Sequence, residues 1–338
     1  MALLEISNLD VRFATPRGVL TAVHDLSFSI AAGETLAIVG ESGCGKSVTS
    51  MSVLRLVPEP PGRVRGAVRF DNREVLALTE REMRGLRGKD IGMIFQEPMT
   101  SLNPVLTVGR QIGETLRVHE GLSARAAAAR AVDMLALVGI SEPERRVGEY
   151  PHQLSGGMRQ RVMIAIALAC TPRLLIADEP TTALDVTIQA QILDLMRDLK
   201  LRVGAAIMLI THDLGVVAEV CKNVLVMYGG NLVEYGTAEQ IFENPRMPYT
   251  QGLLASLPRV DDTTHRRLEP IKGQPPNLLR LPPGCAFAPR CSYRMPVCDQ
   301  PVPLYDFGEG HVARCFLYDE RYKDQRTIEV ESAKVVSA

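Results

Sequence analysis

Short runs of apolar residues alternate with helical stretches over about the first 250 residues of the chain. Five runs have the length and composition of buried strands: LAIVG (36–40), IGMIF (91–95), LLIAD (174–178), AIMLIT (206–211) and NVLVMY (223–228). Strands that alternate with helices are typical of an α/β fold with a mainly parallel sheet. The pattern therefore predicts such a fold for this part of the chain.

Between residues 98 and 165 the pattern changes, because no strand run interrupts the helical sequence. The segment SARAAAARAVDMLALVG (123–139) has a serine at the position of an N-cap, alanine-rich turns and a closing glycine. These are signals for the start, body and end of a helix. We expect residues 98–165 to form a helical insertion in the α/β domain.

The C-terminal part of the chain has a different composition. Residues 258–283 are rich in proline, polar and without periodicity, which is typical of a linker or extended arm. The stretch from about residue 319 mixes charges with small residues and is expected to be disordered. The sequence thus predicts a main domain (1–258), a small extension (259–318) and a disordered tail (319–338).

Charge and hydropathy narrow the class of protein. The 38 Lys and Arg residues nearly balance the 39 Asp and Glu residues, so nothing indicates the basic surface of a nucleic-acid-binding protein. No apolar run approaches the roughly 18 residues of a membrane span. The N-terminal MALLEISNLDVRF has no basic region before an apolar one, unlike a signal peptide. We therefore expect a cytosolic protein, in which thiols stay reduced.

The motif GESGCGKS (40–47) follows the first strand run and precedes a helical stretch. It matches the phosphate-binding loop G-x-x-x-x-G-K-[ST], whose backbone N–H groups surround phosphates at a helix N-terminus. A chance glycine-rich turn is the alternative, and the full eight-residue match in the correct context disfavours it. The expected nucleotide contacts come from Gly40, Glu41, Ser42, Gly43, Cys44, Gly45, Lys46, Ser47 and Val48, with Lys46 on the outer phosphates and Ser47 on Mg²⁺.

Two acids stand at the end of the strand run in RLLIADEP (173–180). The carboxyl ends of strands are where α/β folds place ligands. We expect Asp178 to hold Mg²⁺ and Glu179 to orient or deprotonate the attacking water. A solvated strand end often carries an acid, but the phosphate loop favours the catalytic interpretation.

The stretch LSGGMRQR (154–161) predicts a second anion-binding helix terminus, formed by Ser155, Gly156 and Gly157. One ATP already has its phosphate loop, so this second site makes sense if it covers the nucleotide of another subunit. Here the sequence resembles the ATP-binding cassette (ABC) ATPases, whose signature motif this is. In that family two cassettes dimerise head to tail around two ATP molecules.

The resemblance extends to further motifs in the family's order. Gln96 in FQEP matches the Q-loop that senses Mg²⁺ or the γ-phosphate, Ala183–Asp185 match the D-loop, and His212 in THD matches the switch histidine. Phe13 occupies the place of the aromatic that stacks on adenine, although a core phenylalanine at a strand end is a competing interpretation. Met158 replaces the commoner glutamine of the signature.

The resemblance implies a P-loop NTPase of the ABC type. This fold has a mainly parallel core, an antiparallel β subdomain and a helical subdomain. The stretches FQEPMTSLNPVLTVG (95–109) and MPYTQGLLASLP (247–258), together with the cysteine-rich tail, resemble the ATPase subunits of bacterial dipeptide and oligopeptide importers. That family implies peripheral attachment to the cytoplasmic face of the inner membrane. Its implied partners are a second, related ATPase subunit, two transmembrane permease subunits and, indirectly, an extracytoplasmic solute-binding protein.

Four cysteines in the tail follow the spacing C-x5-C-x6-C-x16-C, at Cys285, Cys291, Cys298 and Cys315. The family implies a [4Fe–4S] cluster. The chemistry of four thiolates fits either such a cluster or zinc, although structural zinc sites usually contain closer cysteine pairs. Unliganded cysteines that pack as small hydrophobes are the third alternative. The polar, proline-rich segment favours them in that order, and we expect a metal to stabilise an extension with little core.

The sequence thus predicts the ATP-hydrolysing subunit of a peptide importer. Other cargo, such as nickel complexes or oligosaccharides, fits the same sequence, because the cargo is selected by other subunits. A soluble ABC ATPase that acts on nucleic acid is a further alternative. It is disfavoured because the chain has one cassette and no basic arm.

Overall fold

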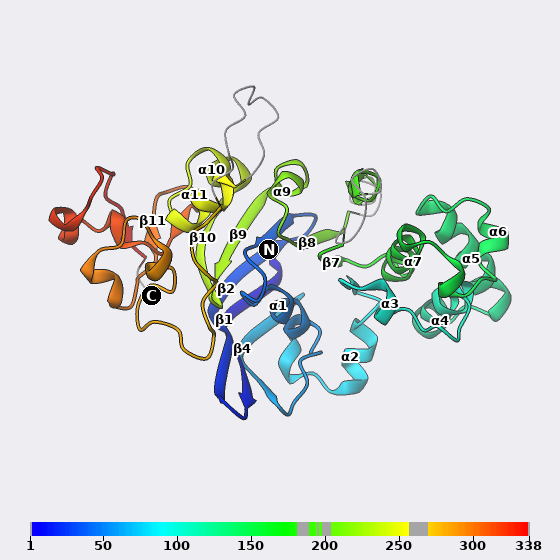
Figure 1. Cartoon of the computed structure of the whole chain (residues 1–338). Helices are drawn as coiled ribbons and strands as arrows, with labels where there is room; N and C mark the ends of the chain where they lie inside the picture. The colour runs from blue at the N-terminus through cyan, green and yellow to red at the C-terminus, as the bar shows by residue number, and fades with distance from the viewer. Residues whose placement is uncertain (1, 181–188, 195, 198–203, 257–269, 337–338) are drawn as a thin grey trace, which may run out of the picture. The chain divides into compact units, whose positions relative to one another are not determined.

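The computed structural model describes residues 2–180, 189–194, 196–197, 204–256 and 270–336. The chain forms two compact units, each assembled from separate stretches of sequence. The first contains residues 1–4, 29–35 and 69–210, and the second contains residues 5–28, 36–68 and 211–338. We describe each unit by itself (Figure 1).

The first unit is built on three parallel strands. β7 (Leu174–Asp178) lies between β6 (Ile91–Ile94) and β8 (Ala206–Thr211), with Met93 opposite Ile176 and Ile176 opposite Met208. All residues of β6, β7 and β8 are buried, as expected for parallel strands covered on both faces. β5 (Arg73–Glu74) pairs with the end of β4 (Gly62–Phe70), and η1 (Val75–Ala77) and α2 (Glu80–Leu86) follow.

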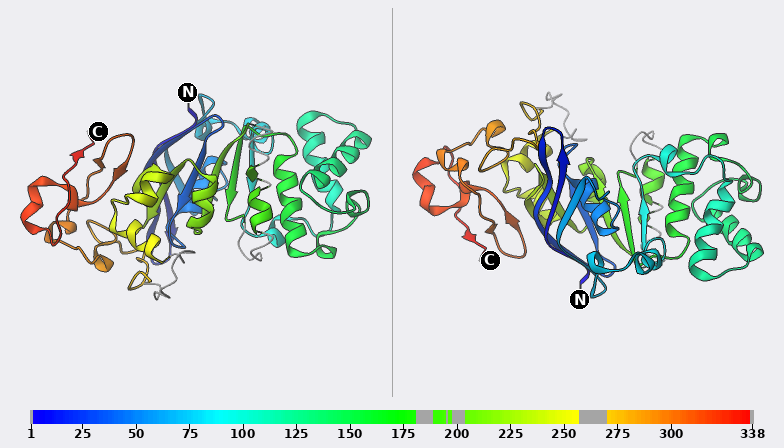
Figure 2. Two further views of the ribbon diagram at one scale, coloured as in Figure 1. Left: turned by 90° about the horizontal axis from the view of Figure 1, so that it is seen from above. Right: turned by 90° about the horizontal axis from the view of Figure 1, so that it is seen from below.

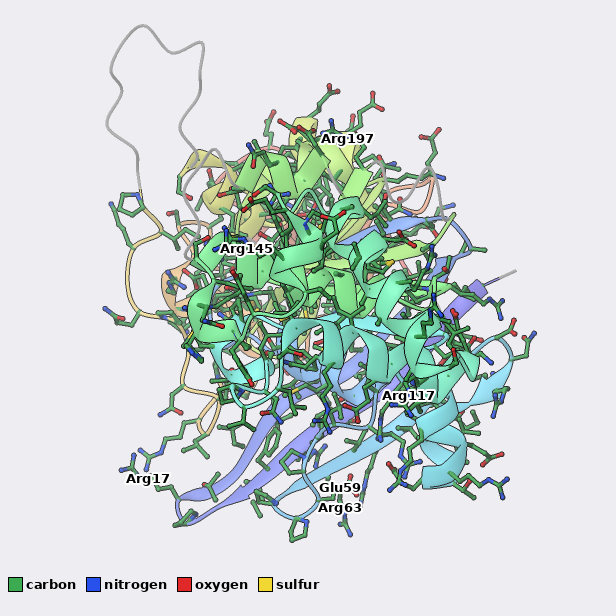
Figure 3. All side chains as sticks on the ribbon, turned by 90° about the vertical axis from the view of Figure 1, so that its right-hand side faces the viewer. Arg17, Glu59, Arg63, Arg117, Arg145 and Arg197 are labelled. Atoms are coloured by element: carbon green, nitrogen blue, oxygen red, sulfur yellow. The ribbon has the colours of Figure 1, made fainter. Side chains whose placement is uncertain are left out.

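Between β6 and β7 this unit is helical. It contains α3 (Pro98–Ser101), α4 (Val108–Glu120), α5 (Ala124–Leu137), α6 (Pro143–Arg146), η2 (Pro151–Gln153) and α7 (Gly156–Leu168). The predicted helix is confirmed as α5, which begins after Ser123, whose hydroxyl accepts the N–H of Ala126. In Figure 2, α4, α5 and α7 lie next to one another, and Figure 3 shows Arg117 of α4 and Arg145 of α6.

Small side chains let α4 and α5 approach closely. Ala127 and Ala131 are buried on α5, and a Cβ atom at Gly113 of α4 would lie 3.6 Å from that of Ala127. The alanines that signalled a helix in the sequence therefore also form its packing face.

The second unit contains a sheet in the strand order β13-β11-β12-β10-β9-β3. β3 (Thr35–Val39) and β9 (Asn223–Tyr228) are parallel, and β10 (Asn231–Thr237) returns antiparallel to β9. With β6, β7 and β8, these strands confirm all five predicted runs to within one residue at each end. The helices are α1 (Lys46–Val53), α9 (Leu214–Val220), α10 (Ala238–Glu243) and α11 (Pro248–Ala255).

This unit also contains most of three further strands: β1 (Ala2–Thr15), β2 (Gly18–Ala31) and β4. They are neighbours in a sheet in the order β2-β1-β4. β1 and β2 form a hairpin, because two residues join neighbouring strands. Its turn carries Arg17, labelled in Figure 3. Among the described residues, no helix is both long and apolar enough to span a bilayer.

The C-terminal segment continues the sheet of the second unit. Its strands are β11 (Tyr305–Asp306), β12 (Val312–Ala313) and β13 (Lys334–Val335), and β12 pairs antiparallel with β10, with Ala313 opposite Glu234. Two short helices, η3 (Ala288–Arg290) and η4 (Pro296–Asp299), precede β11, and two more, η5 (Phe316–Tyr318) and η6 (Glu320–Gln325), lie between β12 and β13. Both η6 and β13 fall in the stretch for which the sequence predicts disorder.

This segment has an apolar core of its own, contrary to our expectation of little core. Its buried residues are Met295, Val297, Tyr305, Phe316, Leu317 and Tyr318. The proline-rich composition concealed this cluster, because its members are dispersed over more than twenty residues of irregular chain.

A buried acid also connects the C-terminal segment to the sheet. Glu234 of β10 is fully buried, and its carboxylate lies 2.8 Å from Nε2 of His311. The same carboxylate accepts the N–H groups of Arg246 (2.6 Å) and Met247 (3.0 Å). One side chain thus satisfies three groups on two other segments.

We predict that Glu234→Ala lowers the free energy of unfolding by about 3 kcal/mol, because it leaves these buried groups without an acceptor. The matched control is Glu243→Ala, which removes an exposed acid of α10 and should change stability by less than about 0.5 kcal/mol. Chemical denaturation of the full chain measures both. Equal losses in the two variants would contradict a structural role for the Glu234–His311 pair.

Candidate functional site

The phosphate-binding motif forms a tight loop between β3 and the N-terminus of α1. Gly40 and Gly45 have φ angles of 152° and 105°, in the region that favours glycine. A Cβ atom at Gly40 would lie 2.3 Å from the carbonyl oxygen of Met227, and one at Gly45 would lie 2.3 Å from that of Ala22. Both positions therefore require glycine for packing as well as for conformation.

Lys46 is the first residue of α1 and is buried. Its Nζ donates hydrogen bonds to the carbonyl oxygens of Gly40 (2.7 Å) and Glu41 (3.2 Å), so the ammonium group lies inside the curve of the loop. Burial raises the pKa of the Cys44 thiol in the same loop. The hydroxyl of Ser47 follows Lys46 in the first turn of α1, which fits the predicted order of phosphate and Mg²⁺ contacts.

Phe13 lies near the end of β1 and is half-buried. Its ring packs toward the start of β4, where a Cβ atom at Gly62 would lie 3.1 Å from Cε1 of Phe13. A partly exposed ring of this kind is compatible with stacking on adenine, and that role stays a prediction.

In the first unit, β7 delivers its two acids as predicted. Asp178 is the last residue of the strand and is 5% exposed. Glu179 follows with a φ angle of 47°, the left-handed conformation that is uncommon for a residue with a side chain, and its N–H donates to the carbonyl of Ile210 (2.8 Å). Such backbone outliers are frequent at functional sites.

Gln96 and Glu179 lie together although 83 residues separate them in sequence. Gln96 Nε2 donates a hydrogen bond to Glu179 Oε2 over 3.0 Å. Gln96 is exposed and lies two residues after the end of β6. β6 is the neighbour of β7 in the sheet. The parallel pairing of these strands therefore brings the predicted sensor residue and the predicted catalytic acid to the same sheet edge.

The signature stretch opens α7, as the sequence predicts. Ser155 is the N-cap residue, and its hydroxyl accepts the N–H of Met158 over 3.3 Å. Ser155 and Gly156 are exposed and Gly157 is half-buried. Further along the helix, the buried Gln160 donates to the carbonyl of Pro180 over 2.6 Å, which connects α7 to the segment that follows Glu179.

His212 lies in the second unit, where it follows β8 and precedes α9. Its side chain is exposed, and the next residue, Asp213, caps α9 by accepting the N–H groups of Gly215 and Val216. The predicted D-loop, Ala183–Asp185, lies outside the described residues.

The four cysteines of the C-terminal segment come together. Cys285, Cys291, Cys298 and Cys315 all line one cavity of about 20 Å³ and are free thiols. Burial raises the pKa of Cys285 to about 11 and raises that of Cys291 and Cys315 as well. Their spacing therefore predicted proximity correctly.

The prediction of a [4Fe–4S] cluster, with zinc as the runner-up, is nevertheless wrong. Within the described part of the chain, no three or more His, Cys, Asp or Glu side chains are grouped so that they could hold a metal ion. Cys298 and Cys315 instead pack against the apolar cluster around Met295 and Phe316. Cysteine behaves there as a small hydrophobe, which is the third of the alternatives given above. The sequence does not reveal it because the residues of this core are dispersed along the chain.

Comparison with solved structures defines the class of protein. The fold matches the dimeric ATP-binding cassette MJ0796, solved in a post-hydrolysis state with ADP and Pi, with a TM-score of 0.63 and 28% identity over 70% of this chain and 98% of that one. It also matches cbiO1 from Clostridium perfringens, part of the ABC transporter complex cbiONQ, with a TM-score of 0.60 and 28% identity over 72% and 91% of the two chains. The fold and the phosphate loop are those of an ABC ATPase.

Sequence comparisons identify the branch. The ABC transporter family model matches residues 23–182, and the model of the oligopeptide/dipeptide transporter C-terminal region matches residues 233–298. The dipeptide transport ATP-binding protein DppD of Bacillus subtilis is 53% identical over 94% of this chain and 95% of its own length. The oligopeptide transport ATP-binding protein OppD of Salmonella typhimurium is 54% identical over 93% of both. The chain therefore belongs to the family of ATP-binding subunits of dipeptide and oligopeptide ABC transporters.

Sequence reasoning missed two pairs of polar side chains in which at least one member is buried. One is His311 with Glu234, and the other is Arg290 with Glu41, 249 residues apart. The available signal for the second pair was an arginine between apolar residues in the stretch FAPRC. A charged residue at such a place needs a buried partner, but the sequence does not show which acid supplies it.

Proposed function

We propose that this chain binds and hydrolyses ATP to energise the import of dipeptides or oligopeptides. The observation that carries the proposal is the phosphate loop around the buried Lys46 in a chain that aligns along nearly its full length with peptide-transport ATP-binding proteins. The hydrogen bond between Gln96 and Glu179 supports the assignment of the hydrolytic residues.

The residues fit a magnesium nucleotide. The loop presents backbone N–H groups and one ammonium group to the phosphates, and Ser47, Gln96 and Asp178 would hold Mg²⁺ with hydroxyl, amide and carboxylate oxygens, the ligands that this ion prefers. The ion supplies positive charge against the phosphates. Glu179 orients the attacking water and accepts its proton, His212 contacts the γ-phosphate, and Phe13 stacks on adenine.

We propose that Ser155, Gly156 and Gly157 cover the nucleotide of a second cassette. The exposed start of α7 supports this, because its N–H groups and dipole would suit a phosphate. MJ0796 was solved as a dimer of cassettes. In this chain we expect the partner to be a related but different ATPase subunit, with Ala183–Asp185 at the same interface.

Two permease subunits complete the proposed assembly, with the chain attached at the cytoplasmic face of the inner membrane. Exposed apolar side chains after Gln96 support a docking surface, since Met99 and Val105 are 58% and 75% exposed. A solute-binding protein outside the membrane would deliver the cargo. We expect no nucleic-acid partner.

We propose residues 1–258 as the cassette, with its helical subdomain at about 98–165, then 259–318 as the extension and 319–338 as a tail. The matched C-terminal family model begins at residue 233, within β10. The pairing of β10 with β12 supports treating the extension as continuous with the sheet of the cassette.

We predict that Glu179→Gln reduces MgATP hydrolysis by roughly 100-fold or more, since the amide keeps the shape of the side chain and removes the base. Nucleotide binding should persist, measured by equilibrium titration beside a phosphate-release assay. Glu144→Gln, which alters an exposed acid of α6, is the matched control and should hydrolyse ATP at the rate of the unaltered chain. Hydrolysis by the Glu179→Gln variant at that rate would refute the catalytic assignment.

Lys46→Ala should instead weaken MgATP binding by at least about 10-fold, because it removes the charge that faces the outer phosphates. Lys89→Ala, which removes an exposed lysine outside the loop, should leave the dissociation constant unchanged. Titration with a fluorescent ATP analogue measures both. An unchanged affinity of the Lys46→Ala variant would place the nucleotide elsewhere.

Ser155→Ala should leave ATP binding to the isolated chain intact and impair hydrolysis by the assembled transporter. The change also removes a helix cap, which costs about 1 kcal/mol. Ser123→Ala removes the equivalent cap of α5 and controls for that loss. If the two variants hydrolyse ATP equally well in the assembled complex, Ser155 does not serve a partner's nucleotide.

A further inference from the structure

Glu41, the second residue of the phosphate loop, is held from three directions within the second unit. Its N–H donates to the hydroxyl oxygen of Tyr249 on α11 over 2.8 Å. Its carbonyl oxygen accepts from Lys46. Its carboxylate accepts two hydrogen bonds from the guanidinium of Arg290, of 2.6 and 3.0 Å. This bidentate geometry is the strongest arrangement of an arginine–carboxylate pair.

Arg290 belongs to the C-terminal segment, and its side chain is 6% exposed. Besides Glu41 it donates to the hydroxyl of Tyr228 (3.1 Å) and to the carbonyl oxygens of Lys272 (2.9 Å) and Ile271 (3.3 Å). These bonds use all the N–H groups of the guanidinium. Because every N–H group is hydrogen-bonded, the guanidinium of Arg290 is held in one orientation. It can therefore fix the position of the Glu41 carboxylate.

The segment that precedes Arg290 also lies against the phosphate loop. Pro275, Pro276 and Leu278 line a cavity of about 20 Å³ together with loop residues 41–44. A Cβ atom at Gly273 would lie 3.3 Å from Cγ of Arg290. The start of the C-terminal segment therefore lies against both the phosphate loop and the side chain of Arg290.

The ion pair between Arg290 and Glu41 affects the charge that the phosphate loop presents to ATP. Glu41 places a carboxylate on the loop that receives the phosphates of ATP, and two like charges at short range repel. Arg290 neutralises this carboxylate, and the ion pair raises the pKa of the guanidinium above its usual range. Without the arginine, the loop would carry an unpaired negative charge beside its ligand.

We propose that Arg290 is a positioning residue of the nucleotide site: from the C-terminal segment it neutralises Glu41 and holds the phosphate loop in the shape that accepts ATP. The inference rests on the proposed ATP site. It gives the C-terminal segment a role in nucleotide affinity that is independent of its cysteines. Arg290 acts through Glu41 and does not contact the reacting atoms.

Arg290→Ala should raise the dissociation constant for MgATP roughly 10-fold, through the repulsion that it exposes. The loss should shrink at high salt, because ions screen a partly exposed charge. Adding Glu41→Ala to Arg290→Ala should restore most of the affinity. In the assembled transporter, KM for ATP should rise more than kcat falls.

The matched control is Arg294→Ala, four residues further on, which breaks an exposed pair with Asp299 and should leave ATP binding unchanged. Thermal unfolding of each nucleotide-free variant shows whether the chain is folded. If the double variant binds ATP as weakly as Arg290→Ala at every salt concentration, charge neutralisation is refuted. Normal affinity of Arg290→Ala would also overturn the proposal. Failure of the unaltered chain to bind ATP would instead refute the proposed function.

Discussion

The nucleotide site depends on how closely the phosphate loop packs against the chain around it. At Gly40 and Gly45, carbonyl oxygens of Met227 and Ala22 occupy the space that a side chain would need. The loop therefore has little freedom to adopt another path between β3 and α1. Its shape is set by the second unit as a whole, including α11 through Tyr249 and the C-terminal segment through Arg290. A site made of backbone N–H groups needs such support, because no side chain can be repositioned to correct a displaced loop.

In the first unit the corresponding constraint is the parallel pairing of β6 with β7. Buried strands in fixed register place Asp178, Glu179 and the segment with Gln96 at one edge. The left-handed backbone at Glu179 and the bond from Gln160 to the following carbonyl then orient this edge. The proposed hydrolytic residues are thus carried at the ends of buried strands that pair in fixed register.

Much of this arrangement could be predicted from the sequence, because the decisive signals are local. Parallel strands buried on both faces read as continuous apolar runs, so β3, β6, β7, β8 and β9 were found within one residue at each end. The phosphate loop and the start of α7 are short motifs. The Glu41–Arg290 and Glu234–His311 pairs could not be predicted, because each joins residues distant in sequence and no local pattern selects the partner. The cysteine prediction failed for a related reason: the apolar residues that pack around the thiols are dispersed along irregular chain.

ATP hydrolysis by this chain is proposed to drive peptide import. The most direct measurement is uptake of a labelled dipeptide or oligopeptide into vesicles that contain the chain with its permease partners and are supplied with the solute-binding protein. Uptake should require MgATP on the side of the chain, stop with the Glu179→Gln variant and be competed by unlabelled peptides. Uptake without ATP would contradict the proposal that ATP hydrolysis drives import. ATP-driven uptake that is competed by a nickel complex or an oligosaccharide, and not by peptides, would contradict the proposed peptide cargo.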